Sequence, residues 1–341
     1  MLASPMLASL GRSIVSPGRL AFSLLLCLLL AAPTAPSRAQ DYPTRPITLV
    51  VPFAPGGGVD LMARLVSGKL EQRLGKTFVI ENKPGGGTII AASYVQKANP
   101  DGYTLLMAPS PTMAVNVSLY KNLPYDPTTD FVPLALLSGT PFVLMVKLDL
   151  PVKSVPELIA YAKANPGTLT FGSAGPGVPH HLFMEVFKSM TGIQASHVPY
   201  RGSLPAVTDL AAGHIPMMFC DIGPAAGLLA AKKVRPLGIS TKTRHRNYPD
   251  IPPLNEAGVP GFEAVSWQMM VAPAKTPRPI VDKLHAELKA VLAMPEVQEQ
   301  IYRMGFLPLP GQGVDEMKAF VKSEIVRWGN VVQKAGIARS Q

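Results

Sequence analysis

A strand that runs into three consecutive glycines and then into a helix is the feature that most constrains the fold of this chain. It spans residues 47–61 (ITLVVPFAPGGGVDL), in which the apolar residues 47–53 have the length and β-branched character of a buried strand. The glycines at 56–58 end the strand, and Asp60 stands where the N-cap of the following helix is expected. Backbone N–H groups at such a turn point outward with the positive end of the helix dipole, and glycine places no Cβ in front of them. The segment predicts either an anion-binding loop or a plain tight turn.

The same arrangement returns one strand–helix unit later. Residues 78–82 (FVIEN) predict a second short strand, and residues 83–88 (KPGGGT) lead into a small-residue helix from Ile89. Two such loops in succession favour a functional role, in which main-chain amides hold a carboxylate. Neither loop has the G-x-G-x-x-G or G-K-[ST] pattern that binds nucleotide phosphates, so nucleotide binding is not expected.

The first 39 residues have the features of a secretory signal peptide and are set apart from the fold. Arg12 and Arg19 precede an apolar run at residues 20–32, and residues 37–39 (SRA) offer small residues at the expected cleavage spacing. The run is shorter than the roughly 18 to 20 residues of a membrane helix, and no later segment approaches that length. We expect cleavage after Ala39 and a soluble, exported mature protein.

The charge and the cysteines limit the classes of partner and of fold. The formal net charge of +10 mildly favours anionic ligands, but no long basic stripe with interleaved aromatic residues indicates nucleic acid. Cys220 is the only cysteine outside the leader, so the mature chain must be held by its core rather than by disulfides. A chain of 341 residues can bury such a core, and its length predicts two domains.

A third strand completes the first part of the chain. Residues 103–108 (YTLLMA) end at residues 109–112 (PSPT), where Ser110 should reach the level of the two glycine loops. In an open parallel sheet, ligands bind outside the carboxyl ends of the strands. The alternation of strand, glycine loop and helix predicts βαβ units, a mostly parallel sheet and an α/β fold.

The pattern restarts at about Phe142, which indicates a second domain. A capping box at Ser154 and Glu157 opens a new helix. The next strand reaches a third glycine-rich segment, residues 172–177 (GSAGPG), which would face the first two if the domains face each other. Its Ser173 lacks the G-x-S-x-G context of a hydrolase nucleophile.

Two later strands end in charged residues. The strand at 195–200 ends before Arg201, which would either meet a ligand's far carboxylate or be solvated. The strand at 215–220 delivers Asp221, which would either accept a hydrogen bond from a ligand or act as a plain N-cap.

Three histidines in this part of the chain, His180, His181 and His197, raise the question of a metal site. No HExxH or CxxC frame accompanies them, so capping or core-edge roles are expected and no metal is predicted.

The end of the chain is expected to return to the first domain. Residues 262–273 (FEAVSWQMMVAP) predict an extended crossing, and a final helix carries an apolar stripe between Met317 and Val332 that needs a docking surface.

Together these segments resemble the Bug-type (TctC-like) periplasmic solute receptors of tripartite tricarboxylate transporters over essentially the whole mature length. The matching blocks are YPTRPITLVVPFAPGGGVDLMAR, VIENKPGGG, NPDGYTLLM, SVPELIAYAKANPGTLTFGSAGPG, GIQASHVPYRG, DLAAGHIPMMFCD and EIVRWGNVVQKAGI. So many blocks in one order are far more specific than one glycine loop.

The resemblance implies a two-domain α/β fold of the type II periplasmic-binding-protein class, with a mostly parallel sheet in each domain and a ligand cleft between them. Residues 40–141 with 267–341 would form domain 1, and residues 142–266 would form domain 2. It implies a monomeric receptor, without cofactor or catalysis, that closes over a small carboxylate and delivers it to a membrane permease. The carboxylate would be a di- or tricarboxylate, an amino acid or an aromatic acid.

The resemblance also implies ligand contacts in this sequence. The near carboxylate would be held, partly through water, by Phe53, Ala54, Gly57, Gly58, Asp60, Gly86, Gly87 and Thr88. The distal part of the ligand would contact Ser173, Ala174, Tyr200, Arg201 and Asp221. Ser110, at the end of the third strand, is a further candidate by its position.

A second class of function stays open. An exported α/β enzyme acting on a carboxylate would use Ser173 or Asp221 together with His181. The sequence disfavours this alternative, because no base, nucleophile and orienting residue occur in a recognisable triad order.

Overall fold

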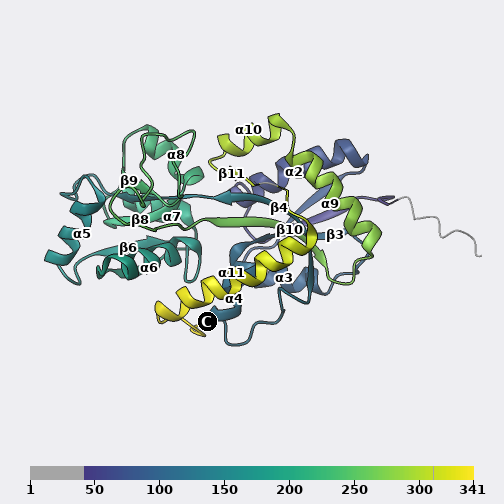
Figure 1. Ribbon diagram of the computed structural model, residues 1–341, viewed down its shortest axis with the longest axis horizontal. Helices are drawn as coiled ribbons and strands as arrows, with labels where there is room; N and C mark the ends of the chain where they lie inside the picture. The colour runs from purple at the N-terminus through teal and green to yellow at the C-terminus, as the bar shows by residue number, and fades with distance from the viewer. Residues whose placement is uncertain (1–41, 310) are drawn as a thin grey trace, which may run out of the picture. The chain divides into compact units, whose positions relative to one another are not determined.

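The computed structural model describes residues 42–309 and 311–341, and the predicted signal peptide lies outside the described residues. The described chain forms two β-sheets flanked by helices (Figure 1). One sheet has 6 strands in the order β11-β4-β10-β3-β1-β2, and the other has 5 strands in the order β7-β6-β8-β5-β9. The expected α/β class with two sheets is confirmed.

The six-stranded sheet is built from both ends of the chain. Its strands are β1 (Ile47–Val51), β2 (Phe78–Asn82), β3 (Thr104–Pro109), β4 (Phe131–Thr140), β10 (Ser266–Pro273) and β11 (Leu307–Pro308). The helical segments of this part are α2 (Gly58–Leu74), η1 (Gly86–Thr88), α3 (Ile89–Gln96), η2 (Pro111–Val115), α4 (Asn116–Leu119), α9 (Arg278–Leu292), α10 (Pro295–Arg303) and α11 (Val314–Lys334).

The five-stranded sheet is built from the middle of the chain. Its strands are β5 (Phe142–Val146), β6 (Thr170–Ser173), β7 (Ser196–Pro199), β8 (Met217–Asp221) and β9 (Arg235–Ile239). Its helices are α5 (Val155–Ala164), α6 (Pro179–Thr191), α7 (Ser203–Ala211) and α8 (Ile222–Ala230). Helix α5 begins with the predicted capping box: Ser154 Oγ accepts from the Glu157 N–H, and the Glu157 carboxylate accepts from the Lys153 N–H.

Both sheets are mixed, so the prediction of mostly parallel sheets was wrong. The strands that precede glycine loops are parallel, since β1 pairs in parallel with β2 and β3, and β6 with β7 and β8. Every antiparallel pair involves β4, β5 or β10. These strands carry the chain from one sheet to the other (Figure 1). Only Pro141 separates β4 from β5. A strand that passes on into the other sheet is not returned by a crossover helix, so no βαβ unit fixes its direction.

The apolar stripe of α11 finds its docking surface. Met317, Val321, Trp328 and Val332 are buried. The helix packs on β4, η2 and α4, and the Trp328 ring stacks on Phe183 of α6 with centroids 5.6 Å apart. Helix α11 therefore contacts elements of both sheets. Among the described helices, none combines the length and the apolar character needed to cross a membrane.

Candidate functional site

The first glycine loop (residues 53–58) is held by a buried acid. Helix α2 begins at Gly58, with Gly57 in extended conformation at the N-cap, so the prediction that Asp60 is the N-cap was wrong. Glycine can occupy the N-cap without a side-chain cap, and Asp60 lies instead in the first turn, where it is 1% exposed. Its carboxylate accepts from the Gly56 N–H at 2.9 Å and from the Arg64 guanidinium.

Asp60 also links the first loop to the second. Burial alone would raise the pKa of Asp60, but hydrogen bonds from Arg64, Gly56 and Asn82 outweigh it and hold that pKa below its usual value. The Asn82 amide, at the end of β2, donates to Asp60 Oδ1 and to the Phe53 carbonyl, both at 2.9 Å. The Asp60 carboxylate and the Asn82 amide therefore hold the first loop against the end of β2, where the second loop begins.

The second glycine loop (residues 83–88) has an unusual backbone. Gly85, Gly86, Gly87 and Thr88 all have positive φ, at 119°, 56°, 58° and 82°. L-residues other than glycine rarely adopt these angles, so the glycines are required and Thr88 is strained. The Thr88 hydroxyl, 4% exposed with its residue, accepts a hydrogen bond from the Thr112 hydroxyl at 2.7 Å, which holds the strained position.

Two side chains from α4 and its C-terminal end donate hydrogen bonds to carbonyls of the second loop. Asn116 of α4 donates to the Gly87 carbonyl at 2.9 Å, and Tyr120 Oη donates to the Gly86 carbonyl at 3.3 Å. The peptide between Gly86 and Gly87 therefore turns the Gly87 N–H away from Tyr120, whereas the Thr88 N–H, opposite the Gly87 carbonyl, donates to the Gly85 carbonyl at 3.1 Å. Within residues 42–309 and 311–341, no acceptor pairs with the N–H groups of Gly57, Gly58, Gly86 and Gly87.

Ser110 lies at the expected edge, directly after β3, but its side chain is engaged. Its hydroxyl hydrogen-bonds the Ser266 hydroxyl at 2.8 Å, and both residues are buried. The pair joins the end of β3 to the start of β10.

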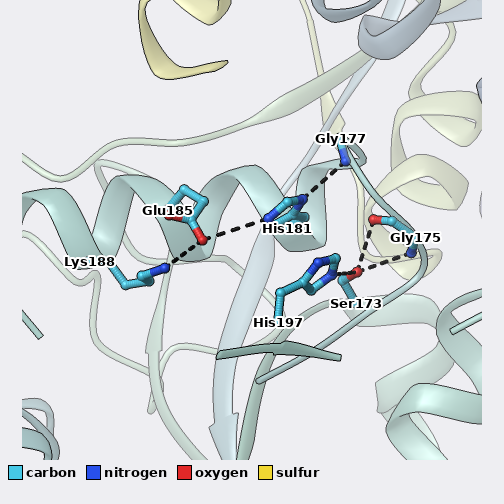
Figure 2. Close-up of polar contacts among 7 residues, drawn as sticks. All are labelled: Ser173, Gly175, Gly177, His181, Glu185, Lys188 and His197. Carbon is cyan, nitrogen blue, oxygen red and sulfur yellow. Dashed lines mark hydrogen bonds and ion pairs between the residues drawn. The ribbon is translucent and has the colours of Figure 1, made fainter. Parts of the chain in front are cut away.

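The third glycine loop (residues 172–177) follows β6, and its serine is used internally (Figure 2). Ser173 is fully buried. Its hydroxyl bonds both the N–H and the carbonyl of Gly175, at 3.1 and 2.9 Å, and lies 2.5 Å from His197 Nε2. The histidine that faces Ser173 is thus His197, whereas the sequence suggested His181.

The third loop approaches the support of the second. A Cβ on Gly177, where φ is +69°, would overlap the Leu119 side chain at the end of α4. Helix α4 also carries Asn116, which binds the Gly87 carbonyl. Glycine at 177 therefore permits a close contact between the loops of the two sheets.

Tyr200 and Arg201 follow β7 and differ in their partners. The Tyr200 hydroxyl donates to Asp209 at 2.7 Å, and burial together with Asp209 raises the pKa of Tyr200 to about 12. Arg201 is exposed, and none of the described residues pairs with its guanidinium. Ala174, in the third loop, is half-buried.

Asp221 occupies the N-cap position of α8, but its side chain caps nothing. Its carboxylate lies 3.1 Å from His180 Nε2. Cys220 adds a third donor, and these three residues place one donor atom each within 4.8 Å of one another. Burial, followed by the charge of Asp221, raises the pKa of Cys220 well above its usual value, so the thiol keeps its proton.

The structure thus brings the predicted loops together at strand ends, and it adds side chains that sequence reasoning missed. Asn82, Asn116, Tyr120 and His197 support the loops from elements next to them. Asn82, directly before the second loop, could have been found from its place at a strand end. Asn116 and Tyr120 follow η2, in a segment without a recognisable motif.

The sequence of the chain matches a known protein family and a curated relative. Residues 62–337 match the model of the tripartite tricarboxylate transporter family receptor (TctC). A curated relative from Pseudomonas sp. (strain P51), the UPF0065 protein in the tcbD-tcbE intergenic region, is 38% identical over 332 residues, covering 96% of each chain.

Solved structures agree over most of the described chain. A structure titled R. palustris Rpa4515 with adipate has a TM-score of 0.81 and 40% identity, covering 87% of this chain and 99% of its own. The periplasmic binding protein BugD has a TM-score of 0.78 and 34% identity, with coverage of 87% and 99%. MatC from Rhodopseudomonas palustris, with bound malate, has a TM-score of 0.77 and 33% identity, with coverage of 85% and 100%.

Two helix-flanked sheets, in a fold shared with these proteins, define a solute-binding receptor of the periplasmic binding protein class. Within that class, the chain belongs to the tripartite tricarboxylate transporter receptor family.

Proposed function

We propose that this receptor binds a small carboxylate between its glycine loops. The proposal rests on a contrast within the first two loops. The Asp60 and Thr88 side chains and the carbonyls of Gly86 and Gly87 are engaged by other groups. Four glycine N–H groups, in contrast, are unpaired among the described residues. Unpaired donors near helix N-termini suit an anion. The adipate and malate of two related structures are ligands of this chemistry.

We assign the near carboxylate to the N–H groups of Gly57, Gly58, Gly86 and Gly87. Phe53 and Ala54 would line this end. Asp60 and Thr88, which the resemblance implied as contacts, would act by holding the loops, because their side chains are buried and already have partners.

For the distal end, we assign Arg201 to a second carboxylate, because its guanidinium is exposed and none of the described residues pairs with it. Tyr200, Ala174 and Asp221 would contact the middle of the ligand. Ser110 and Ser173 would shape the site without donating to the ligand, since their hydroxyls are engaged.

We propose a receptor without catalysis. The enzyme alternative needs Ser173 or Asp221 to work with His181, but Ser173 is fully buried beside His197 and Asp221 pairs with His180. The Ser173 hydroxyl, which already bonds Gly175, is not presented as a nucleophile.

We further propose two domains, residues 40–141 with 267–341 and residues 142–266, that close over the ligand. Delivery to a membrane permease, export to the periplasm and a monomeric state complete the proposal. The support is the family, together with strands β4, β5 and β10, which connect the two sheets.

The test compares ligands that differ by one group. Calorimetry with adipate, hexanoate and adipamide, and thermal shift with sugars as controls, should show binding of adipate and at least tenfold weaker binding of adipamide. An amide would turn its own NH₂ towards some of the donors and leave them unpaired, at about 1 to 3 kcal/mol each. A ligand at 100 times its Kd should stabilise the fold by about 2.7 kcal/mol.

Two further arms separate the assignments. Arg201→Gln should remove most of the preference for adipate over hexanoate, whereas Arg278→Gln, an exposed arginine in α9, should retain it. Product analysis after prolonged incubation should recover the acids unchanged. Responses to sugars alone would reject carboxylate binding, and turnover would reject a pure receptor.

A further inference from the structure

Two histidine rings lie face to face beneath the third glycine loop (Figure 2). His181 of α6 and His197 of β7 stack with ring centroids 3.8 Å apart and an interplanar angle of 10°. His181 is 5% exposed and His197 is half-buried, and Phe171 packs beside both rings, with its centroid 5.1 Å from that of His197 and 5.9 Å from that of His181. The pair thus lies between α6 and the sheet.

Each ring holds one end of the loop. His181 Nδ1 accepts from the Gly177 N–H at 3.1 Å, and His197 Nε2 lies 2.5 Å from the Ser173 hydroxyl. The two contacts are not equivalent in their protonation. A hydrogen on His197 Nε2 satisfies Ser173, which can then donate to Gly175. A hydrogen on His181 Nδ1 would instead break the hydrogen bond from the Gly177 N–H, because both groups would then be donors.

The charged groups next to the stack lie on the side of His181. From α6, the Glu185 carboxylate lies 3.7 Å from His181 Nε2, and Lys188 bonds Glu185 at 2.7 Å. Strand β6 presents the neutral Phe171 and Ser173, and Asp209 of α7 bonds the Tyr200 hydroxyl rather than a ring. Two imidazolium rings in contact repel each other, and burial together with His181 lowers the pKa of His197 to about 4. The stack thus excludes a proton from His197 down to about pH 4, and the Glu185 carboxylate faces the other ring.

The contact between His181 and Gly177 is connected to the second glycine loop. Gly177 packs against Leu119, and the same short helix carries Asn116, which fixes the Gly87 carbonyl. A displacement of Gly177 would remove the contact between the third loop and the support of the second.

We propose that His181 is a positioning residue for solute binding: its unprotonated Nδ1 holds the third glycine loop through Gly177, and a proton taken up by the His181–His197 stack releases the loop and weakens binding. The inference rests on the proposed carboxylate site. It makes the receptor's affinity depend on pH through a residue that does not touch the ligand.

The experiment uses the mature protein with adipate as the probe, by calorimetry from pH 7.5 to pH 5.0, the range in which histidines commonly titrate. His181→Asn keeps an acceptor near the position of Nδ1 but cannot be protonated, whereas His181→Ala removes the acceptor. His214→Gln, at an exposed histidine outside the loop, is the matched control. The titration of adipate itself is common to all variants, so only differences between their profiles count.

We expect wild type and His214→Gln to lose at least tenfold more affinity over this range than His181→Asn, and His181→Ala to bind at least tenfold more weakly than wild type at pH 7.5. Equal slopes in wild type and His181→Asn would overturn the proposal.

A ligand-free arm separates failure of this inference from failure of the proposed function. Hydrogen exchange of the peptide containing Gly177, corrected for the intrinsic pH dependence of exchange, should show lower protection at pH 5.0 in wild type but not in His181→Asn. If no carboxylate binds at any pH, the proposed function fails, and this measurement still decides: unchanged protection in wild type would overturn the positioning role.

Discussion

Gly87 combines two constraints that can be separated by experiment. Its φ is +58°, and a Cβ there would overlap the Tyr120 hydroxyl. Gly75, at the end of α2, has a similar φ of +65° with nothing within 4 Å of a Cβ. Valine at either position should cost about 1 to 2 kcal/mol of backbone strain.

We therefore expect Gly75→Val and Gly87→Val both to lower the melting temperature, and only Gly87→Val to abolish adipate binding. The reason is that Gly87→Val displaces Tyr120 from the Gly86 carbonyl and opens the second loop. Differential scanning calorimetry and titration calorimetry on both variants provide the measurements. Retained binding by a folded Gly87→Val protein would show that the second loop does not hold the ligand.

His197 gives the stability of the fold a defined pH dependence. Burial, and then His181, lowers its pKa to about 4, whereas an unfolded histidine titrates near about 6.5. Between these values the unfolded chain binds a proton that the folded chain excludes. The stabilisation is therefore fully present above about pH 6.5 and is lost as the pH falls to about 4.

His197→Gln, which keeps a polar group facing Ser173, should narrow the difference in melting temperature between pH 7.0 and pH 4.5. His214→Gln should keep the wild-type difference. Thermal melts followed by circular dichroism test this, and an unchanged difference in His197→Gln would mean that His197 does not titrate between these values.

Individual residues also show where sequence reasoning stops. The glycine loops were predictable because glycine runs after apolar strands have few other structural meanings. The roles of Asp60 and Ser173 were not, because each depends on partners supplied by other residues: Asn82, 22 positions from Asp60, and His197, 24 positions from Ser173. Whether Ser173 faces a histidine of the next helix or of the neighbouring strand depends on tertiary packing, which short motifs do not fix.

At the scale of elements, α11 is anchored by a buried carboxylate. Glu324 is 5% exposed, and its Oε2 accepts from the indole N–H groups of Trp267 at 2.7 Å and Trp328 at 2.8 Å. Its other oxygen accepts from Arg327. One side chain thus joins β10 to α11.

Glu324→Leu should destabilise the fold by about 2 to 5 kcal/mol, because two buried indole donors lose their acceptor at about 1 to 3 kcal/mol each. Glu256→Leu, at an exposed residue paired with Arg244, should change stability by less than about 1 kcal/mol. Urea denaturation followed by circular dichroism measures both. A loss below about 1 kcal/mol in Glu324→Leu would mean that the helix does not depend on this contact.

Element positions followed from the sequence better than element directions. Apolar runs and capping signals located most of the strands and α5, because hydrophobic periodicity and caps are local, but β4, β9 and β11 were not predicted. The antiparallel pairing of β5 and β10 could not be predicted from the sequence. The direction of a strand depends on which sheet and which edge the preceding element lies at. A buried strand has the same apolar composition in either direction.

At the scale of the whole molecule, the proposed function requires the two sheets to move relative to each other. Strands β4, β5 and β10 connect them, and α11 touches α6 through Trp328 and Phe183. X-ray scattering should give a smaller radius of gyration with saturating adipate than without it. Gly87→Val provides the control, since added adipate should leave its radius unchanged. Equal radii in verified free and bound wild type would exclude closure.

The pairing of Trp267 and Trp328 on Glu324 has a consequence for observing such a movement. The chain contains 2 tryptophans, and both lie within hydrogen-bonding distance of the same carboxylate. The Trp328 ring also stacks on Phe183 of α6, a helix beside the five-stranded sheet. Intrinsic fluorescence excited at the indole band therefore originates from a single place, the seam between β10, α11 and α6. Any movement of Phe183 relative to Trp328 would alter that emission. Intrinsic tryptophan fluorescence can therefore report such a movement without an attached dye.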